Sequence, residues 1–220
     1  MSRIFNRLSA SGIFLVSATL CGTAAAQVPK AGFFTLVNAV SLSTNTIVSV
    51  DGKALRPDGI KPGMVTGGLG FAEGSHRLDV ANGKAKPASL QIPVAAAACP
   101  IVVIYSARRL DPSGRPADEL RLFSRPHAQT TKGKQFFALY AGQAASRSVQ
   151  INGRPLALKP LQEVRIGTAA SASVKESSRA IDDFAPEEEG NYLIVFFDGK
   201  DNALRAVLAP DIVYQAGGPR

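Results

Sequence analysis

Two groups of charged side chains are the residues of this 220-residue sequence whose types and spacing could do chemistry. The acidic group lies near the C-terminal end and comprises Asp182, Asp183, Glu187, Glu188 and Glu189. Clustered carboxylates supply the hard oxygen ligands that Ca²⁺ prefers, so this segment is a candidate calcium site. Its spacing does not follow the EF-hand pattern, and the alternative interpretation is a solvated acidic loop.

The basic group surrounds one predicted hairpin and comprises Arg108, Arg109, Arg115, Arg121 and Arg125. A guanidinium binds carboxylate or phosphate through two parallel hydrogen bonds, so these arginines are candidate ligand-binding residues for a carboxylated or phosphorylated polymer. The alternative is a charged sheet edge, which blocks unwanted strand pairing.

The other reactive residues give little evidence for catalysis. The two histidines, His76 and His127, have no neighbouring cysteines at the spacing of a zinc site. No G-x-S-x-G motif marks a nucleophilic serine. The glycine run Gly67–Gly70 lacks the lysine and hydroxyl residue of a phosphate-binding loop. We therefore predict no enzymatic activity and no cofactor.

The N-terminal residues have the three-part pattern of a secretory signal peptide. Arg3 and Arg7 precede a short apolar segment over residues 13–20, and Ala24-Ala25-Ala26 ends the pattern. Cleavage after Ala26 predicts a periplasmic or secreted protein. No later stretch is long and apolar enough for a transmembrane helix, since residues 95–105 are interrupted by Pro100.

Net charge and cysteine content indicate which partners to expect and what role the remaining cysteine has. The formal net charge of +8 becomes about +6 once the signal peptide is removed, which favours anionic partners. Nucleic acid is not an expected partner outside the cytoplasm. Cleavage also removes Cys21 and leaves only Cys99, which precedes the apolar run Ile101–Tyr105 and is expected to be a small buried residue.

The elements that position these side chains are strands that recur along the chain. Residues 46–55 and 148–156 each alternate apolar and polar residues, then turn at Asp51-Gly52 or Asn152-Gly153. Alternation of period two predicts a half-buried strand, and an Asx-Gly pair predicts a tight hairpin turn. Residues 33–37, 101–105 and 120–123 also have later counterparts, at 136–140, 193–197 and 204–208. Four matching elements in the same order indicate an internal repeat.

The predicted fold is all-β, with two small antiparallel β-sandwich units in tandem, immunoglobulin-like or jelly-roll-like, and little helix. Its predicted segments are a signal peptide at 1–26, a first sandwich at 27–126, a linker at 127–135, a second sandwich at 136–211 and a tail at 212–220. Pro93 predicts an edge position for the strand over Leu90–Val94, and the β-branched run at 101–105 predicts a central strand.

Two segments of the first unit, Val48–Lys53 and Glu73–Val80, resemble motifs of known exported domains. They are similar to PEGA domains, which run from a V-x-V-D-G strand to a Gly-x-His strand, and to bacterial extracellular domains with a V-Y-V-D-G-K strand. In layout the chain resembles the periplasmic accessory proteins of alginate O-acetylation systems. These resemblances imply a β-sandwich fold and an accessory role in the cell envelope.

The sequence therefore predicts an exported, non-enzymatic binding or scaffold protein of the bacterial envelope, an accessory to exopolysaccharide modification or export. The alternative is a tandem carbohydrate-binding module that contacts an acidic glycan directly, and the third hypothesis is an esterase or transferase. The expected partner is an envelope protein or an anionic polysaccharide.

Overall fold

A computed structural model describes residues 31–83, 85–96, 98–129 and 132–212. Over these residues the chain forms strands and no helix, and so contains no helix long and apolar enough to cross a membrane. The all-β prediction is confirmed. The predicted signal peptide and nearly all of the predicted tail lie outside the described residues.

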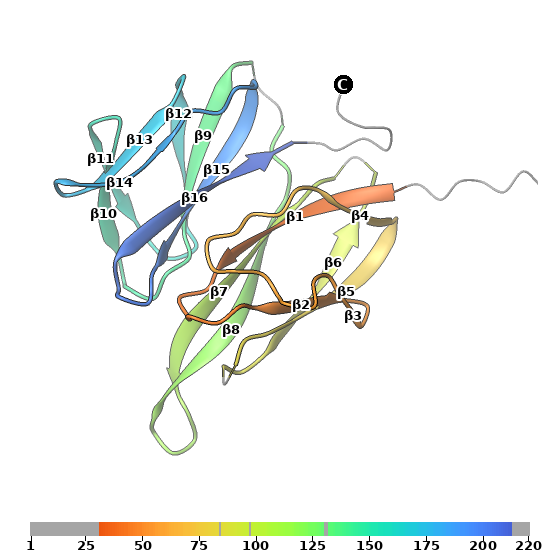
Figure 1. Cartoon of the computed structure of the whole chain (residues 1–220). Coiled ribbons are helices and arrows are strands. Elements are labelled where there is room, and N and C mark those ends of the chain that lie inside the picture. The colour runs from red at the N-terminus through yellow and green to blue at the C-terminus, as the bar shows by residue number, and fades with distance from the viewer. Residues whose placement is uncertain (1–30, 84, 97, 130–131, 213–220) are drawn as a thin grey trace, which may run out of the picture.

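The first half folds into two four-stranded sheets that face each other (Figure 1). Its outer sheet has the order β3-β2-β5-β6 and its inner sheet the order β4-β1-β7-β8. The strands are β1 (Ala31–Ala39), β2 (Ile47–Val50), β3 (Lys53–Ala54), β4 (Leu69–Ala72), β5 (Gly74–Ala81), β6 (Ala88–Val94), β7 (Ile101–Leu110) and β8 (Pro116–Arg125). As predicted, β6 is an edge strand and β7 a central one.

The second half repeats this topology strand for strand, with an outer sheet β11-β10-β13-β14 and an inner sheet β12-β9-β15-β16. The strands are β9 (Lys134–Tyr140), β10 (Arg147–Ile151), β11 (Arg154–Leu158), β12 (Glu163–Thr168), β13 (Ala172–Glu176), β14 (Arg179–Phe184), β15 (Gly190–Asp198) and β16 (Leu204–Asp211). The tandem arrangement is confirmed, with one correction. Each inner sheet contains a parallel pair, β1 with β7 and β9 with β15, which the long crossover between the paired strands permits.

The central strands of the inner sheets, β1, β7, β9 and β15, are largely buried on both faces because the two inner sheets pack against each other. In β15, Ile194 and Phe196 contribute to the core of the second half, whereas Leu193 and Val195 contribute to a third core between the halves. In β1, Val37 and Ala39 belong to the same third core. Double burial explains why β7 and β15 read as continuous apolar runs rather than alternating ones. The two halves therefore form a single packed unit of four sheet layers.

The two Asx-Gly turns have equivalent structures and fix the outer sheets. Asp51 and Asn152 both have positive φ values, of 49° and 51°. The Asp51 carboxylate accepts a hydrogen bond from the backbone N–H of Arg77 (2.9 Å), and the Asn152 side-chain oxygen accepts one from Ser173 N–H (2.8 Å). In each half the turn side chain thus ties the β2–β3 or β10–β11 hairpin to the neighbouring strand.

A buried ionic cluster joins the end of the first half to the second. Arg125, 4% exposed at the end of β8, forms ion pairs with Glu163 on β12 and Asp211 on β16. Its guanidinium carbon lies 4.9 Å from the centre of the Phe137 ring. Asp211 also accepts hydrogen bonds from His127 Nδ1 (2.5 Å) and from the backbone N–H of Ala128 (3.1 Å), so the segment after β8 is held against the second half.

Replacing Arg125 should therefore destabilise the whole molecule. Arg125→Met would leave the buried Asp211 carboxylate without its main countercharge, and we expect a loss of about 3–5 kcal/mol in the free energy of unfolding. The matched control is Arg121→Met, four residues earlier on the same strand, where the partly exposed pair with Glu119 (3.3 Å) is worth at most about 1 kcal/mol. Urea denaturation of both variants measures the difference, and equal losses would contradict a structural role for Arg125.

Candidate functional site

A cleft of about 630 Å³ lies between the two halves. This volume is within the range of ligand-binding clefts in proteins. We call it the inter-half cleft, and define it by its lining: Val40, Ser41, Leu42, Ser43, Asn45, Lys61, Pro62, Gly63, Phe197, Gly199, Lys200, Arg205, Ala206 and Val207.

Every charged side chain that lines this cleft is basic. They are Lys61 from the loop between β3 and β4, Lys200 from the β15–β16 turn and Arg205 from β16. Arg205 has a distant exposed partner, Asp201, at 3.8 Å. No carboxylate of the described residues lies within ion-pair distance of Lys61 or Lys200. Cations on facing walls give the cleft a positive potential.

The floor of the cleft is apolar and forms where the loop after β3 approaches β15. Val40 and Phe197 are buried there, and Val207 is half-buried. Gly63 has a φ of +77°, and a Cβ at this position would lie 3.4 Å from Cζ of Phe197. A glycine is therefore suited to this close approach, both by its backbone conformation and by its lack of a side chain.

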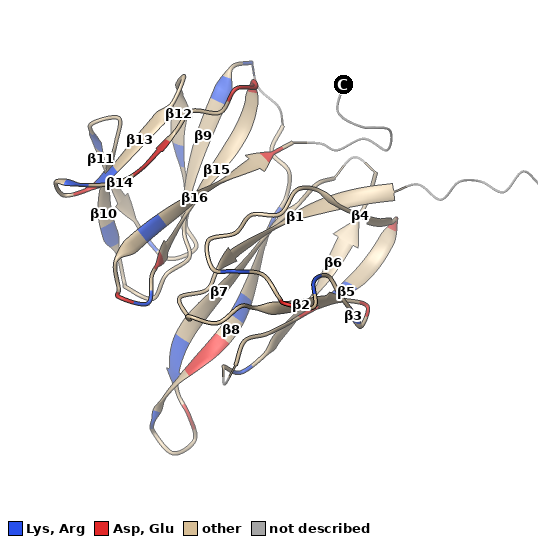
Figure 2. Ribbon diagram, viewed as in Figure 1, with Lys and Arg blue, Asp and Glu red and all other residues tan. Residues whose placement is uncertain are grey.

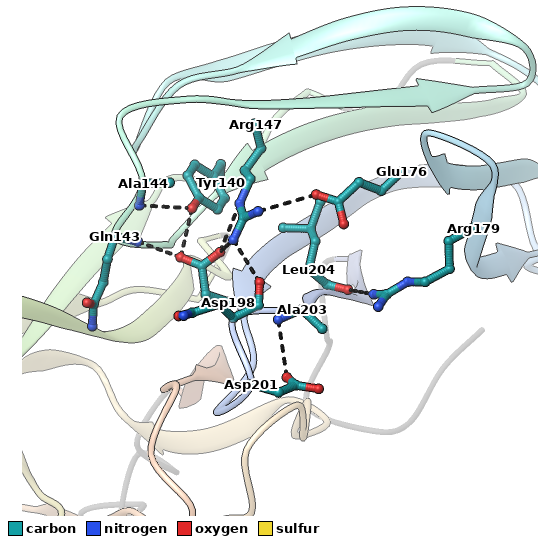
Figure 3. Close-up of polar contacts among 11 residues, drawn as sticks. Tyr140, Gln143, Ala144, Arg147, Glu176, Arg179, Asp198, Asp201, Ala203 and Leu204 are labelled. Atoms are coloured by element: carbon teal, nitrogen blue, oxygen red, sulfur yellow. Dashed lines mark hydrogen bonds and ion pairs between the residues drawn. The ribbon is translucent and has the colours of Figure 1, made fainter.

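A buried polar cluster surrounds Asp198 (Figure 3), at the start of the β15–β16 turn. This turn carries Lys200 to the wall of the cleft. The Asp198 carboxylate accepts hydrogen bonds from the Tyr140 hydroxyl (2.8 Å), the backbone N–H of Gln143 (2.8 Å) and the Arg147 guanidinium (2.7 Å). Arg147 also donates to the backbone carbonyl of Asn202 (2.8 Å) at the far side of the β15–β16 turn. The cluster thus fixes both ends of the turn.

The cluster alters the acidity of its members. Burial, together with the hydrogen bond to Asp198, raises the pKa of Tyr140 to about 12. Burial alone would raise the pKa of Asp198 as well, but the hydrogen bonds from Gln143, Tyr140 and Arg147 lower it below its usual value. At neutral pH the hydroxyl is therefore protonated and the carboxylate ionised, a pairing suited to positioning the turn.

A second hollow of about 210 Å³ adjoins the cleft, because both are lined by Ser41, Leu42, Ser43, Gly199 and Lys200. It extends the basic lining to Arg108, one of the predicted ligand-binding arginines. The carboxylates that line it, Asp118 and Asp198, face Arg108 and Arg147 respectively.

None of the predicted ligand-binding arginines lines the inter-half cleft itself. Most of them lie on the β7–β8 hairpin, where Figure 2 shows basic and acidic residues close together. Arg108 and Arg109 are exposed and pair across it with Asp118 (3.9 Å) and Glu119 (3.5 Å), and Arg121 pairs with Glu119 as well. Arg115 is exposed beside the hairpin loop. Arg125 does not belong to this exposed group, since it is buried in the ionic cluster between the halves.

The predicted calcium ligands are spread over a strand and a loop. Asp182 and Asp183 lie on β14, whereas Glu187, Glu188 and Glu189 lie in the following loop, which ends at β15. Glu189 accepts a hydrogen bond from the backbone N–H of Gly133 at 3.3 Å. Within the described part of the chain, no group of three or more His, Cys, Asp or Glu side chains is arranged to hold a metal ion.

His76 is a structural residue of the first half. Its two ring nitrogens lie 2.7 Å from Asp51 Oδ2 and 2.7 Å from the carbonyl oxygen of Ala72. Both neighbours accept hydrogen bonds, so the ring bonds to both only when it is protonated, and the hydrogen bond to Asp51 raises the pKa of His76. This pair thus joins the Asp51 turn to β5.

Sequence reasoning did not single out Lys61, Lys200 or Arg205. A signal for Lys200 was present, because Asp198-Gly199-Lys200 repeats the residues of the predicted Asp51-Gly52-Lys53 turn. Nothing comparable marks Lys61, which joins the cleft only through the packing of the two halves.

Comparisons with known proteins do not assign the chain to a family: no protein-family model matches its sequence, and no curated protein matches it.

Loss of the Asp198 carboxylate should destabilise the protein in a pH-dependent manner. Asp198→Asn weakens the buried hydrogen bonds from Arg147 and Tyr140, and we expect a loss of about 2 kcal/mol at pH 7. Because the pKa of Asp198 is lowered in the folded state, the wild-type advantage exists above about pH 4 and diminishes as the pH falls further. Urea denaturation between pH 7 and pH 2.5 tests this, and a constant gap between variant and wild type would contradict it.

The stabilising effect of His76 should have the opposite dependence on pH. Its folded-state pKa is raised, so its stabilisation is complete below about pH 6.5 and is lost as the pH rises through that raised value. We expect His76→Gln to be less stable than wild type at pH 6 and to lack the decline in stability that wild type shows toward pH 9. A variant that declines as steeply as wild type would show that another group is responsible.

Proposed function

We propose that this chain is an exported, non-enzymatic binding or scaffold protein of the bacterial envelope, an accessory to the modification or export of an exopolysaccharide. The observation that supports it best is the inter-half cleft, whose charged lining is entirely basic and whose walls come from both halves. A shared core holds those walls together, so the cleft is preformed. A preformed cationic cleft fits an anionic partner, with little ordering cost on binding.

The other polar clusters each have a structural role, which favours a binding function over a catalytic one. The Asp198 cluster fixes a turn, the Arg125 cluster joins the halves, and the Asp51–His76 pair ties a hairpin to a strand. Each group is engaged by neighbours within the fold.

A second candidate function, direct binding of an acidic glycan, is favoured by the same basic lining and by the adjoining hollow that reaches Arg108. The two functions differ in what the cleft contacts: an envelope protein in the first, the polymer in the second.

A pull-down from a detergent-solubilised envelope separates these functions. The tagged protein is expressed with residues 1–26 in place, so that N-terminal sequencing also tests for cleavage after Ala26. We expect recovery of a protein partner that persists at moderate salt, since buried contacts are screened less than exposed charges. Recovery of anionic polysaccharide alone, lost as salt rises, would favour the second function. Recovery of neither would contradict both.

A further inference from the structure

The strand that borders the inter-half cleft, β16, is the last strand of its sheet (Figure 1). Three consecutive residues of it, Arg205, Ala206 and Val207, line the cleft. Successive side chains of a strand point to opposite faces, so consecutive lining residues indicate that the cleft meets the edge of the sheet as well as one face.

The backbone of β16 offers hydrogen-bonding groups at this edge. Phe196, the register partner of Ala206, accepts a hydrogen bond at its carbonyl from the N–H of Ala141, on the β9 side (2.7 Å). Phe196 and Ala206 are therefore a non-hydrogen-bonded pair, and Ala206 directs its N–H and carbonyl away from β15. Leu208, two residues further on, does the same.

Over the described residues, no hydrogen bond from outside the sheet reaches the backbone of Ala206 or Leu208. At the neighbouring outward-facing positions of β16, the backbone groups are already hydrogen-bonded or cannot donate. The Leu204 carbonyl accepts a hydrogen bond from Arg179 (2.8 Å), and Pro210 has no N–H to donate. The available edge is thus a short segment between these two residues.

A strand added beside β16 would have a hollow next to each of its two faces. The inter-half cleft lies on the face of Arg205 and Val207, and a hollow of about 370 Å³ between β14 and β16 also borders the strand. Ile181 lines this second hollow, and Ala206 and Leu208 pack with it against the core of the second half. One face of an added strand would therefore meet the cations of the cleft, and the other would meet Ile181 in a hollow that Arg179 and Asp201 also line.

We propose that the β16 edge binds an extended segment of a partner protein, which adds as a fifth strand to the sheet β12-β9-β15-β16. The segment alternates acidic side chains, directed into the cleft toward Lys61, Lys200 and Arg205, with apolar side chains directed toward Ile181. Main-chain hydrogen bonds to Ala206 and Leu208 supply affinity, and the alternating side chains supply specificity. The proposal rests on the proposed function, because it names the kind of partner and the surface that binds it.

The test is the same envelope pull-down with an edge-blocking variant. Ala206→Pro removes an outward N–H that the folded protein does not use, and proline is tolerated at such edge positions. The matched control is Ser124→Pro on β8, the corresponding edge strand of the first half, where the alternation from Leu120 also directs the backbone outward. Urea denaturation of both variants checks that they fold.

We expect wild type and Ser124→Pro to recover the partner, and Ala206→Pro to lose it. With the recovered partner added, hydrogen exchange at the amides of Ala206 and Leu208 should slow in wild type. Lys61→Glu/Lys200→Glu should lower affinity at least about tenfold at low salt, since both cations face acidic side chains of the segment. The matched pair Lys53→Glu/Lys175→Glu, exposed on the outer sheets, makes the same change in net charge elsewhere and should have little effect.

Each other outcome has a defined meaning. Equal recovery by Ala206→Pro and wild type, or unchanged exchange at Ala206 and Leu208, would overturn the edge proposal and leave the proposed function standing. Recovery of polysaccharide alone would overturn it in favour of direct glycan binding. Should Ala206→Pro fail to fold, Leu208→Pro makes the same test two residues away, and the exchange measurement on wild type decides the question without either variant.

Discussion

The packing of two sheets against each other through a shared apolar core is the constraint on which the rest of this structure depends. Val37, Val103, Val195 and Phe197 belong to that core, so β1, β7 and β15 must be apolar on both faces. Separation of the halves would expose this surface to water, and the hydrophobic effect opposes that exposure. The two repeats therefore behave as one unit, and the hollow at the margin of their contact is a fixed feature of the fold.

Much of the remaining polar chemistry serves this packing. A buried charge is tolerated only when it is paired and hydrogen-bonded, and Asp198 and Asp211 both satisfy this condition. Asp211 joins β16 to Arg125 and to the segment after β8, and Asp198 joins β15 to Arg147 and Tyr140. The two carboxylates lie at opposite ends of the β15–β16 hairpin, which they fix at its turn and at its terminus. Lys61 and Lys200 belong to neither network, so their charges stay free to meet a partner.

The fold was largely predictable from the sequence, and the candidate site was not. Asx-Gly turns and period-two alternation are local signals, and they identified most of the strands and the order of the repeat. The parallel pairs β1–β7 and β9–β15 were missed because pairing over so long a separation leaves no local pattern. Arg125 was grouped with the exposed arginines because its charge is visible in the sequence, whereas its burial depends on Glu163 and Asp211, residues of the other half. Lys61 and Lys200 face one cleft for the same non-local reason.

The two equivalent edge strands, β8 and β16, are protected in different ways. A sheet that is not closed into a barrel has two edges, and natural proteins cover or interrupt them to avoid unwanted pairing. In the first half, Lys86 pairs with the backbone of β8 through Asp118 and Leu120. In the second half, a side chain, Arg179, covers the Leu204 carbonyl, and Pro210 interrupts the strand near its end. Between them Ala206 and Leu208 keep outward backbone groups beside a cleft of positive charge. An edge protected on both sides of a short opening admits a short strand while excluding a long one, and the cations beside it select for acidic side chains.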